Sequence, residues 1–159
     1  MNPYAKHLDG QDPMDVMAET PTALRASVRR MGDAGMASTY EPGKWTASQI
    51  LCHMADCEIA FSFRIRQAFV QSPHLIQPFD QEAWAKGYDT LDPYLALETF
   101  TGLRNWNVAL LQARAADIAS RTVSHPERGD MTLQGMLEII AGHDINHRKQ
   151  LETIAAAAA

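Results

Sequence analysis

The stretch WTASQILCHMADCEIAFSFRIRQAFV, residues 45–70, predicts a long amphipathic helix. Thr46 and Gln49 stand three positions apart at its start, the spacing of a capping box in which each side chain bonds the backbone N–H of the other residue. Apolar residues then recur every three or four positions, as they do on one packed face of a helix. They are Ile50, Met54, Cys57, Phe61, Ile65 and Phe69. We therefore expect a helix over about residues 47–70 with this stripe buried.

Three other segments repeat the three-and-four spacing of apolar residues. An aspartate followed by a proline, a favourable N-cap and first helical residue, opens two of them, over about residues 12–34 and 92–117. Pro21 is expected to kink the first of these helices. The last segment begins near Thr132 and continues to about Ile154. The expected packed faces are Met14, Met17, Leu24, Val28 and Met31; Phe100, Leu103, Trp106 and Leu110; and Leu133, Met136, Ile140, His143, His147, Leu151 and Ile154.

Four amphipathic helices of about 20 residues each predict an all-α fold, a four-helix bundle. The connection between the second and third helices, roughly residues 71–91, is too long for a tight turn and should cross the bundle. The chain shows no repeat and no strand-like alternation, and residues 124–130 are expected to form a loop. A chain of 159 residues that is 46% hydrophobic predicts one domain, with a polar leader at 1–11 and an alanine-rich tail at 155–159.

Composition excludes several classes of partner. A net charge of -5 and a pI near 5.6 argue against nucleic-acid binding, which depends on clustered Lys and Arg. No apolar run approaches the roughly 20 residues that cross a bilayer, and the first residues lack the apolar core of a secretory signal. Cys52 and Cys57 are five apart on one expected helix, so they point to different sides and do not bridge. A cytoplasmic protein without membrane or nucleic-acid partners is expected.

The last helix carries two histidines on its apolar stripe, in the sequence GHDINHRKQLE, residues 142–152. His143 and His147 are four apart, which places them about 40° apart around the helix and about 6 Å along it, close enough to converge on one metal ion. Spacing alone is a weak signal, because such pairs also arise by chance. Burial strengthens it, since an unpartnered buried imidazole loses about 1 to 3 kcal/mol. A shared metal ion would satisfy both rings.

A third ligand is available on the second helix. His53 lies at the edge of the apolar stripe of that helix, and an open catalytic site uses three protein ligands. Cys57, one turn later, is either a fourth ligand or core packing. The remaining histidines are expected to have surface or structural roles. They are His7 in the leader, His74 in the crossover and His125 in the loop.

Four blocks of sequence resemble the DinB-like superfamily, also described as bacillithiol and mycothiol transferase-like. They are PGKWTASQILCHMADCE at 42–58, FRIRQAF at 63–69, FDQEAWA at 79–85 and SHPERGDMTLQGMLEIIAGHDINHRKQLE at 124–152. The blocks occur in the family's order and spacing, and the resemblance extends from about Tyr4 to Ile154.

The resemblance implies a four-helix bundle, often a homodimer, that holds a divalent metal, commonly zinc or nickel. The ligands it implies are one histidine of the second helix and an HxxxH pair of the last, which here are His53, His143 and His147. Some members of the family conjugate low-molecular-weight thiols to electrophiles, and many have no assigned reaction. An enzyme acting on a small-molecule substrate is therefore expected.

Thiol transfer is the first of three functional hypotheses. A metal-bound thiol would be held as its thiolate and directed at an electrophile. Arg64 could pair with a carboxylate of the thiol cofactor, and Gln150 could hydrogen-bond to a bound water or substrate. The structural alternatives are an ion pair between Arg64 and an acid such as Asp80, and a Gln150 side chain that caps a backbone group.

Hydrolysis is the second hypothesis, because HDINH differs from the zincin pattern HExxH by Asp144 in place of the catalytic glutamate. Asp144 would then be the general base. However, its side chain is one methylene shorter, and it lies about 100° around the helix from His143. The alternative for Asp144, as for Asp56, is a hydrogen bond that supports a metal ligand or joins two helices. The third hypothesis is a non-catalytic metal-binding or stress-related bundle, although three neutral ligands leave the open positions that suit a reactive site.

Overall fold

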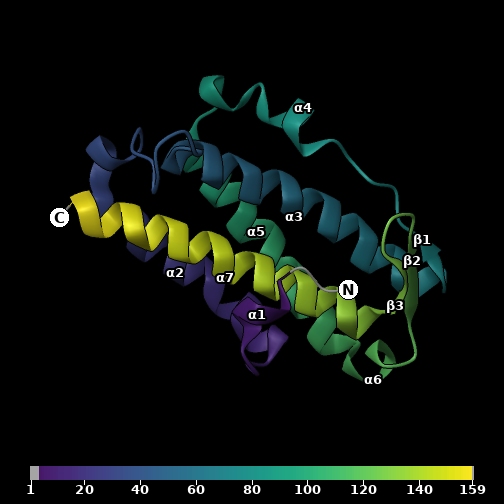
Figure 1. Ribbon diagram of the computed structural model, residues 1–159. Helices are drawn as coiled ribbons and strands as arrows, with labels where there is room; N and C mark the ends of the chain where they lie inside the picture. Colours follow the sequence, from purple (N-terminus) through teal and green to yellow (C-terminus); the bar gives the residue numbers. More distant parts are fainter. Residues whose placement is uncertain (1–3, 159) are drawn as a thin grey trace.

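The computed structural model describes residues 4–158 and confirms the predicted four-helix bundle (Figure 1). The long helices are α2 (Pro13–Gly35), α3 (Ala47–Val70), α5 (Pro93–Ala113) and α7 (Leu133–Ala158). Shorter helices are α1 (Ala5–Leu8), α4 (Gln81–Ala85), α6 (Ala115–Ile118) and the 3-10 turn η1 (Tyr88–Thr90). The strands are β1 (His74–Leu75), β2 (Thr122–His125) and β3 (Gly129–Thr132).

The helices begin where local capping chemistry predicts. Thr46 and Gln49 form both hydrogen bonds of the capping box, at 2.9 and 3.2 Å. Asp12 and Asp92 accept bonds from the backbone N–H groups two residues later, at 2.7 and 2.8 Å. These caps satisfy N–H groups that have no partner within the helix, which is why each helix starts there.

The helices pack in a ring in which α2 contacts α7 and α5, and α3 contacts α5 and α7. One core cluster joins Phe61 and Ile65 of α3 to Leu133 of α7, and a second joins Leu51 to Ile154. Early residues of α3 therefore pack with late residues of α7, so the two helices are antiparallel. As a result their midpoints, which carry the predicted ligands, lie at the same level.

A small sheet closes one end of the bundle, opposite the C-terminal end of α7 (Figure 1). β1 lies in the crossover and pairs in parallel with β2, with His74 opposite Val123. β2 and β3 form an antiparallel hairpin. The expectation of a loop at 124–130 was therefore wrong. The strands are too short to show alternation, and one pairing joins segments about fifty residues apart.

Three further expectations need correction. Helical φ/ψ angles in α2 are interrupted at Gly32 (φ 57°), not at Pro21. The third predicted helix divides at Arg114 into α5 and α6. On α5, Trp106 is 66% exposed, whereas Arg104 and Asn107 are buried. The packed face of α5 is therefore rotated from the predicted one, because these two polar side chains turn inward to bond other buried groups.

Parts of the expected leader and tail are helical, although no helix was predicted there. Within the expected leader, α1 packs on α7. Most of the expected alanine tail forms the last turn of α7, and Ala155 is buried. Residues 1–3 of that leader and residue 159 of that tail lie outside the described residues. None of the helices in the described part of the chain combines the length and apolar character needed to span a bilayer.

Candidate metal site and its cavity

The three predicted ligands lie together in the structure. The ring centroids of His53, His143 and His147 are 4.5 to 5.2 Å apart, and the Nε2 atoms of His53 and His143 are 3.0 Å apart. Imidazoles bound at about 2.0 Å to one tetrahedral ion would have centroids about 5 Å apart. All three side chains are buried. Ligand atoms of His53, Cys57 and His143 all lie within 4.8 Å of one another, close enough to hold one ion, and the His147 ring lies beside this group.

The protonation of these rings suits metal binding. Burial, together with a smaller effect of the neighbouring His143, lowers the pKa of His53 to about 3. Burial likewise holds the pKa of His147 well below its ordinary value. The His147 Nδ1 atom lies 2.8 Å from Gln150 Oε1. Because an amide oxygen only accepts, Nδ1 carries the proton and Nε2 keeps the lone pair that a metal requires.

Cys57 also lies at the cluster. Its Sγ atom is 3.5 Å from His53 Nε2, and burial raises the pKa of its thiol. Nitrogen and sulfur ligands of one tetrahedral zinc ion are about 3.5 Å apart, given bond lengths of about 2.0 and 2.3 Å. Cys57, which lies on the apolar stripe of α3, is therefore also close enough to be a metal ligand.

His143 supplies the observation that tests the fit of a metal. Its Nδ1 atom is buried and has no hydrogen-bond partner among residues 4–158, and the nearest carboxylate oxygen, on Asp144, is 3.9 Å away. Its Nε2 atom lies 3.0 Å from His53 Nε2, and two imidazole nitrogens at this distance satisfy each other only if one of them carries a proton. A divalent ion bound at both Nε2 atoms would satisfy this pair without a proton between them, so the residues present fit a metal. His143 Nδ1 would then carry the ring proton.

Asp144 has a different role from the one that the HDINH pattern suggested. It is wholly buried, and both of its oxygens pair with the Arg104 guanidinium, which also holds Glu58 at 2.7 Å. Burial raises the pKa of Asp144, but the Arg104 charge outweighs this and holds the pKa below its ordinary value. A carboxylate held in this way is a poor general base. The interhelical alternative is the one observed.

The buried charges form a satisfied network across three helices. Arg104 of α5 lies between Glu58 of α3 and Asp144 of α7, and it also donates to the Met17 carbonyl at 3.3 Å. Asn107 donates to the same glutamate at 2.6 Å. The Arg104 cation and the two carboxylates are thus paired and hydrogen-bonded, and burial of a charge is costly without such partners.

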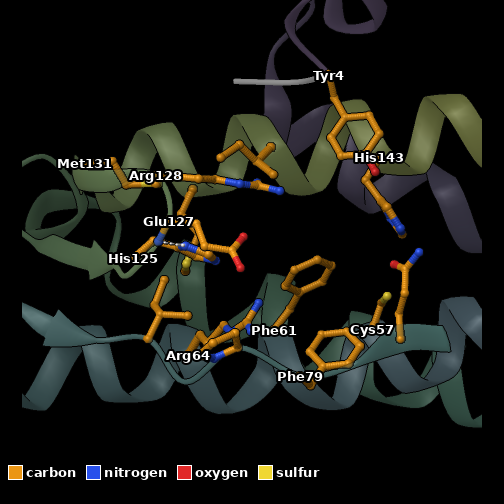
Figure 2. Close-up of a pocket in the computed structure, with 15 residues that line it drawn as sticks. Tyr4, Cys57, Phe61, Arg64, Phe79, His125, Glu127, Arg128, Met131 and His143 are labelled. Atoms are coloured by element: carbon orange, nitrogen blue, oxygen red, sulfur yellow. Dashed lines mark hydrogen bonds between the residues drawn. The ribbon is translucent and has the colours of Figure 1, made fainter. Parts of the chain in front are cut away.

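A cavity of about 290 Å³ adjoins the imidazole cluster. It lies between α3, α7, the crossover and the β2–β3 hairpin (Figure 2). Its lining residues are Tyr4, Cys57, Phe61, Arg64, Ile76, Pro78, Phe79, Gln81, His125, Glu127, Arg128, Met131, Met136, Ile139 and His143. His143 and Cys57 connect the cluster with this cavity, so a bound molecule can reach the candidate metal position.

Arg64 and Gln150, which were predicted to contact a bound molecule, both lie at the site, but with contacts that differ from the structural alternatives predicted for them. Arg64 lines the cavity and donates to the Gln77 carbonyl at 2.9 Å. It forms no ion pair with Asp80, whose side chain caps α4 by accepting from the Ala83 N–H. Gln150 bonds the ring of His147 rather than a backbone group, so it orients a candidate ligand.

Tyr4 is a site residue that the sequence did not reveal. Its ring meets His143 edge-on at 5.6 Å. A Cβ atom added to Gly142 would lie 2.6 Å from Tyr4 Cβ and 2.7 Å from its carbonyl oxygen, so only glycine permits this approach. A glycine within a strongly helical pattern was the available signal.

The other three histidines lie in different parts of the structure. His74 is buried, its ring meets that of Phe63 edge-on at 6.1 Å, and neither ring nitrogen has a hydrogen-bond partner among the described residues. His7 lies in α1, against Tyr4. His125 lines the cavity together with Glu127 and Arg128, and these three residues were missed because the hairpin was expected to be a loop.

Acid should destabilise the metal-free protein through His53. Its pKa is about 3 when folded and 6.5 in its ordinary state, so the unfolded chain binds the proton more tightly. The stability is complete above pH 6.5 and is lost as the pH falls toward 3, at about 1.4 kcal/mol per unit. Urea unfolding of chelated protein should show a loss of about 3 kcal/mol from this ring by pH 4.5. A His53→Asn variant with the same pH dependence would contradict this origin.

Comparison with known proteins identifies the family. The family model described as the DinB superfamily matches residues 17–151. The chain belongs to the DinB superfamily. The resemblance of the four sequence blocks is thereby confirmed.

Relatives of this DinB-superfamily protein carry names that refer to metals. "Putative metal-dependent hydrolase YfiT" of Bacillus subtilis is 28% identical over 137 residues, covering 84% of this chain and 77% of that protein. A similarly named protein of Oceanobacillus iheyensis is 26% identical and covers 86% and 80%. The solved YfiT structure, described as "a probable metal-dependent hydrolase with an unusual four-helix bundle topology", superposes with a TM-score of 0.83 at 26% identity, over 91% of this chain and 85% of that one.

Proposed function

We propose that this DinB-superfamily protein is a metal-dependent enzyme that transfers a small thiol to a small electrophilic substrate. The observation that carries the proposal is the convergence of His53, His143 and His147 at one end of a cavity large enough for a small molecule. A zinc or nickel ion bound there would supply a Lewis-acid centre that lowers the pKa of a bound thiol or water.

The surrounding residues hold the ligand rings in position. Gln150 orients His147, and Tyr4 covers His143 on the side facing the N-terminal segment. Burial raises the pKa of Tyr4, so its hydroxyl keeps its proton at neutral pH. Phe61 contacts His143 edge-on at 5.9 Å and contributes to the apolar wall of the cavity.

Thiol chemistry is favoured because the described carboxylates near the imidazoles are already engaged. Asp144 and Glu58 pair with Arg104, and Asp56 accepts a hydrogen bond from the Tyr88 hydroxyl at 2.9 Å. Glu127 lies toward the far end of the cavity (Figure 2). A thiol has a pKa of about 8.5 and water about 15.7, so a thiol needs less help from a protein base.

Hydrolysis is the second candidate, and the names of the relatives favour it. In that case the water would have to ionise without Asp144. The homodimer, the cytoplasmic location and the absence of nucleic-acid partners remain expectations. Phe63 on α3 and Trp106 on α5 are exposed apolar side chains of the kind that a dimer contact would use.

A pair of assays separates the two reactions. Zinc- or nickel-loaded protein is incubated with 1-chloro-2,4-dinitrobenzene and cysteine, glutathione or bacillithiol, and separately with nitrophenyl esters without thiol. We expect thiol-dependent product that disappears on chelation and in His147→Ala, but not in the control His7→Gln. Thiol-independent ester cleavage that requires the metal would instead establish the hydrolase. If neither reaction occurs and chelation lowers the melting temperature, the ion is structural.

A further inference from the structure

The end of the cavity away from the imidazoles carries two arginines from different elements. Arg64 comes from α3 and Arg128 from the turn between β2 and β3, with Glu127 beside them (Figure 2). Neither guanidinium forms an ion pair within residues 4–158. Two unpaired cations at one end of a small cavity form a favourable environment for an anion.

Arg64 is held in position. One of its nitrogens donates to the Gln77 carbonyl, and its guanidinium lies 5.9 Å from the Phe61 ring centroid and 5.6 Å from that of Phe79. A guanidinium has five N–H donors, so several remain for a ligand. Its partial burial lowers its pKa, and the charge of Arg128 lowers it further. An anion between the two arginines would reduce this mutual repulsion.

The rest of the cavity wall is mainly apolar. Ile76 and Phe79 come from the crossover, and Met131 and Met136 come from the hairpin and α7. At about 290 Å³, the cavity is near the lower end of the size range of small-molecule sites. The charged groups are therefore at one end, the candidate metal ligands at the other, and apolar side chains between them.

We infer that the cavity binds a small organic carboxylate whose anionic group pairs with Arg64 and Arg128, and whose apolar body extends toward His143. This inference rests on the proposed function for its chemistry, because it names the substrate class of that site. Glu127 lies at the same end and competes with the ligand for the guanidinium groups. It therefore limits affinity for anions.

Two probes of nearly equal shape test the inference, 4-phenylbutanoate and its neutral amide, 4-phenylbutanamide. Binding of each to the full chain is measured by isothermal titration calorimetry. We expect the carboxylate to bind about tenfold more tightly than the amide, because hydrogen bonds between a guanidinium and a charged acceptor are stronger than those to a neutral one. The Arg64→Gln/Arg128→Gln variant should bind both equally, and Glu127→Gln should strengthen carboxylate binding. Arg30→Gln, an exposed arginine on α2 outside the cavity, serves as the matched control.

Three outcomes would overturn the inference. They are equal binding of the two probes by the native chain, a carboxylate preference that survives the double arginine substitution, and no binding of either probe at millimolar concentration. The second outcome would mean that another group, such as the metal, recognises the carboxylate. Repeating the titration after chelation separates this inference from the proposed function, because the arginine-dependent preference should persist without metal. Metal content of His147→Ala, measured separately, bears only on the proposed function.

Discussion

Replacing Arg104 with methionine is expected to lower the free energy of unfolding by about 3 to 5 kcal/mol. Arg104 is 1% exposed, and its partners Glu58 and Asp144 are fully buried. Without the guanidinium, two carboxylates would remain in the core with no cation to balance them. Each would then have to take up a proton or draw water into the bundle. Urea denaturation followed by circular dichroism at pH 7 measures the loss.

An exposed ion pair provides the control for this substitution. Arg25 bonds Glu98 at 2.6 Å at the surface, where solvent screens an ion pair so that it contributes little to stability. Arg25→Met should therefore leave the free energy of unfolding nearly unchanged. Adding Glu58→Gln and Asp144→Asn to Arg104→Met should recover part of the loss, because the unpaired charges are removed. Equal effects of Arg104→Met and Arg25→Met would disprove the energetic role of the network.

Removing any one of the three imidazoles is expected to abolish stable metal binding. Loss of a group that only orients a ligand already reduces affinity by about 10- to 100-fold, so loss of a ligand should cost at least about 100-fold. Elemental analysis of dialysed His53→Ala, His143→Ala and His147→Ala proteins should therefore find little metal where the native protein retains it. Gln150→Ala should fall between these variants and the native protein, because it orients His147 without reaching the ion.

His125→Gln is the matched control, since this histidine lines the cavity but belongs to the hairpin end. Circular dichroism confirms that each variant is folded. Native metal content in His147→Ala would remove it from the ligand set. Cys57→Ser tests the sulfur separately: if Cys57 binds the ion, cobalt-substituted native protein should show thiolate-to-metal absorption that the serine variant lacks, with the imidazole bands retained.

Local chemistry was sufficient to predict the long helices from sequence. The capping box of Thr46 and Gln49 and the aspartate caps at residues 12 and 92 depend on atoms within a few residues, and each was found. The candidate metal ligands on α7 could be predicted for a related reason. His143 and His147 repeat at helical spacing within an apolar stripe, so their burial follows from the periodicity.

Contacts between segments that are distant in the chain could not be predicted from the sequence in this way. Arg104 and Asn107 interrupt the apolar spacing of α5, and only the positions of Glu58 and Asp144 on other helices explain why they turn inward while Trp106 is exposed. The partner of each of these charges is at least 40 residues away in the chain.

The sequence by itself thus determined the helices, their caps and the residue types able to hold a metal, because these depend on interactions between near neighbours. Only the tertiary structure decided that Tyr4 reaches His143, that Arg128 lines the same cavity as Arg64, and that Asp144 pairs with an arginine. Those relations arise when the antiparallel helices and the hairpin pack together, since packing brings residues from opposite ends of the chain within a few ångströms of each other.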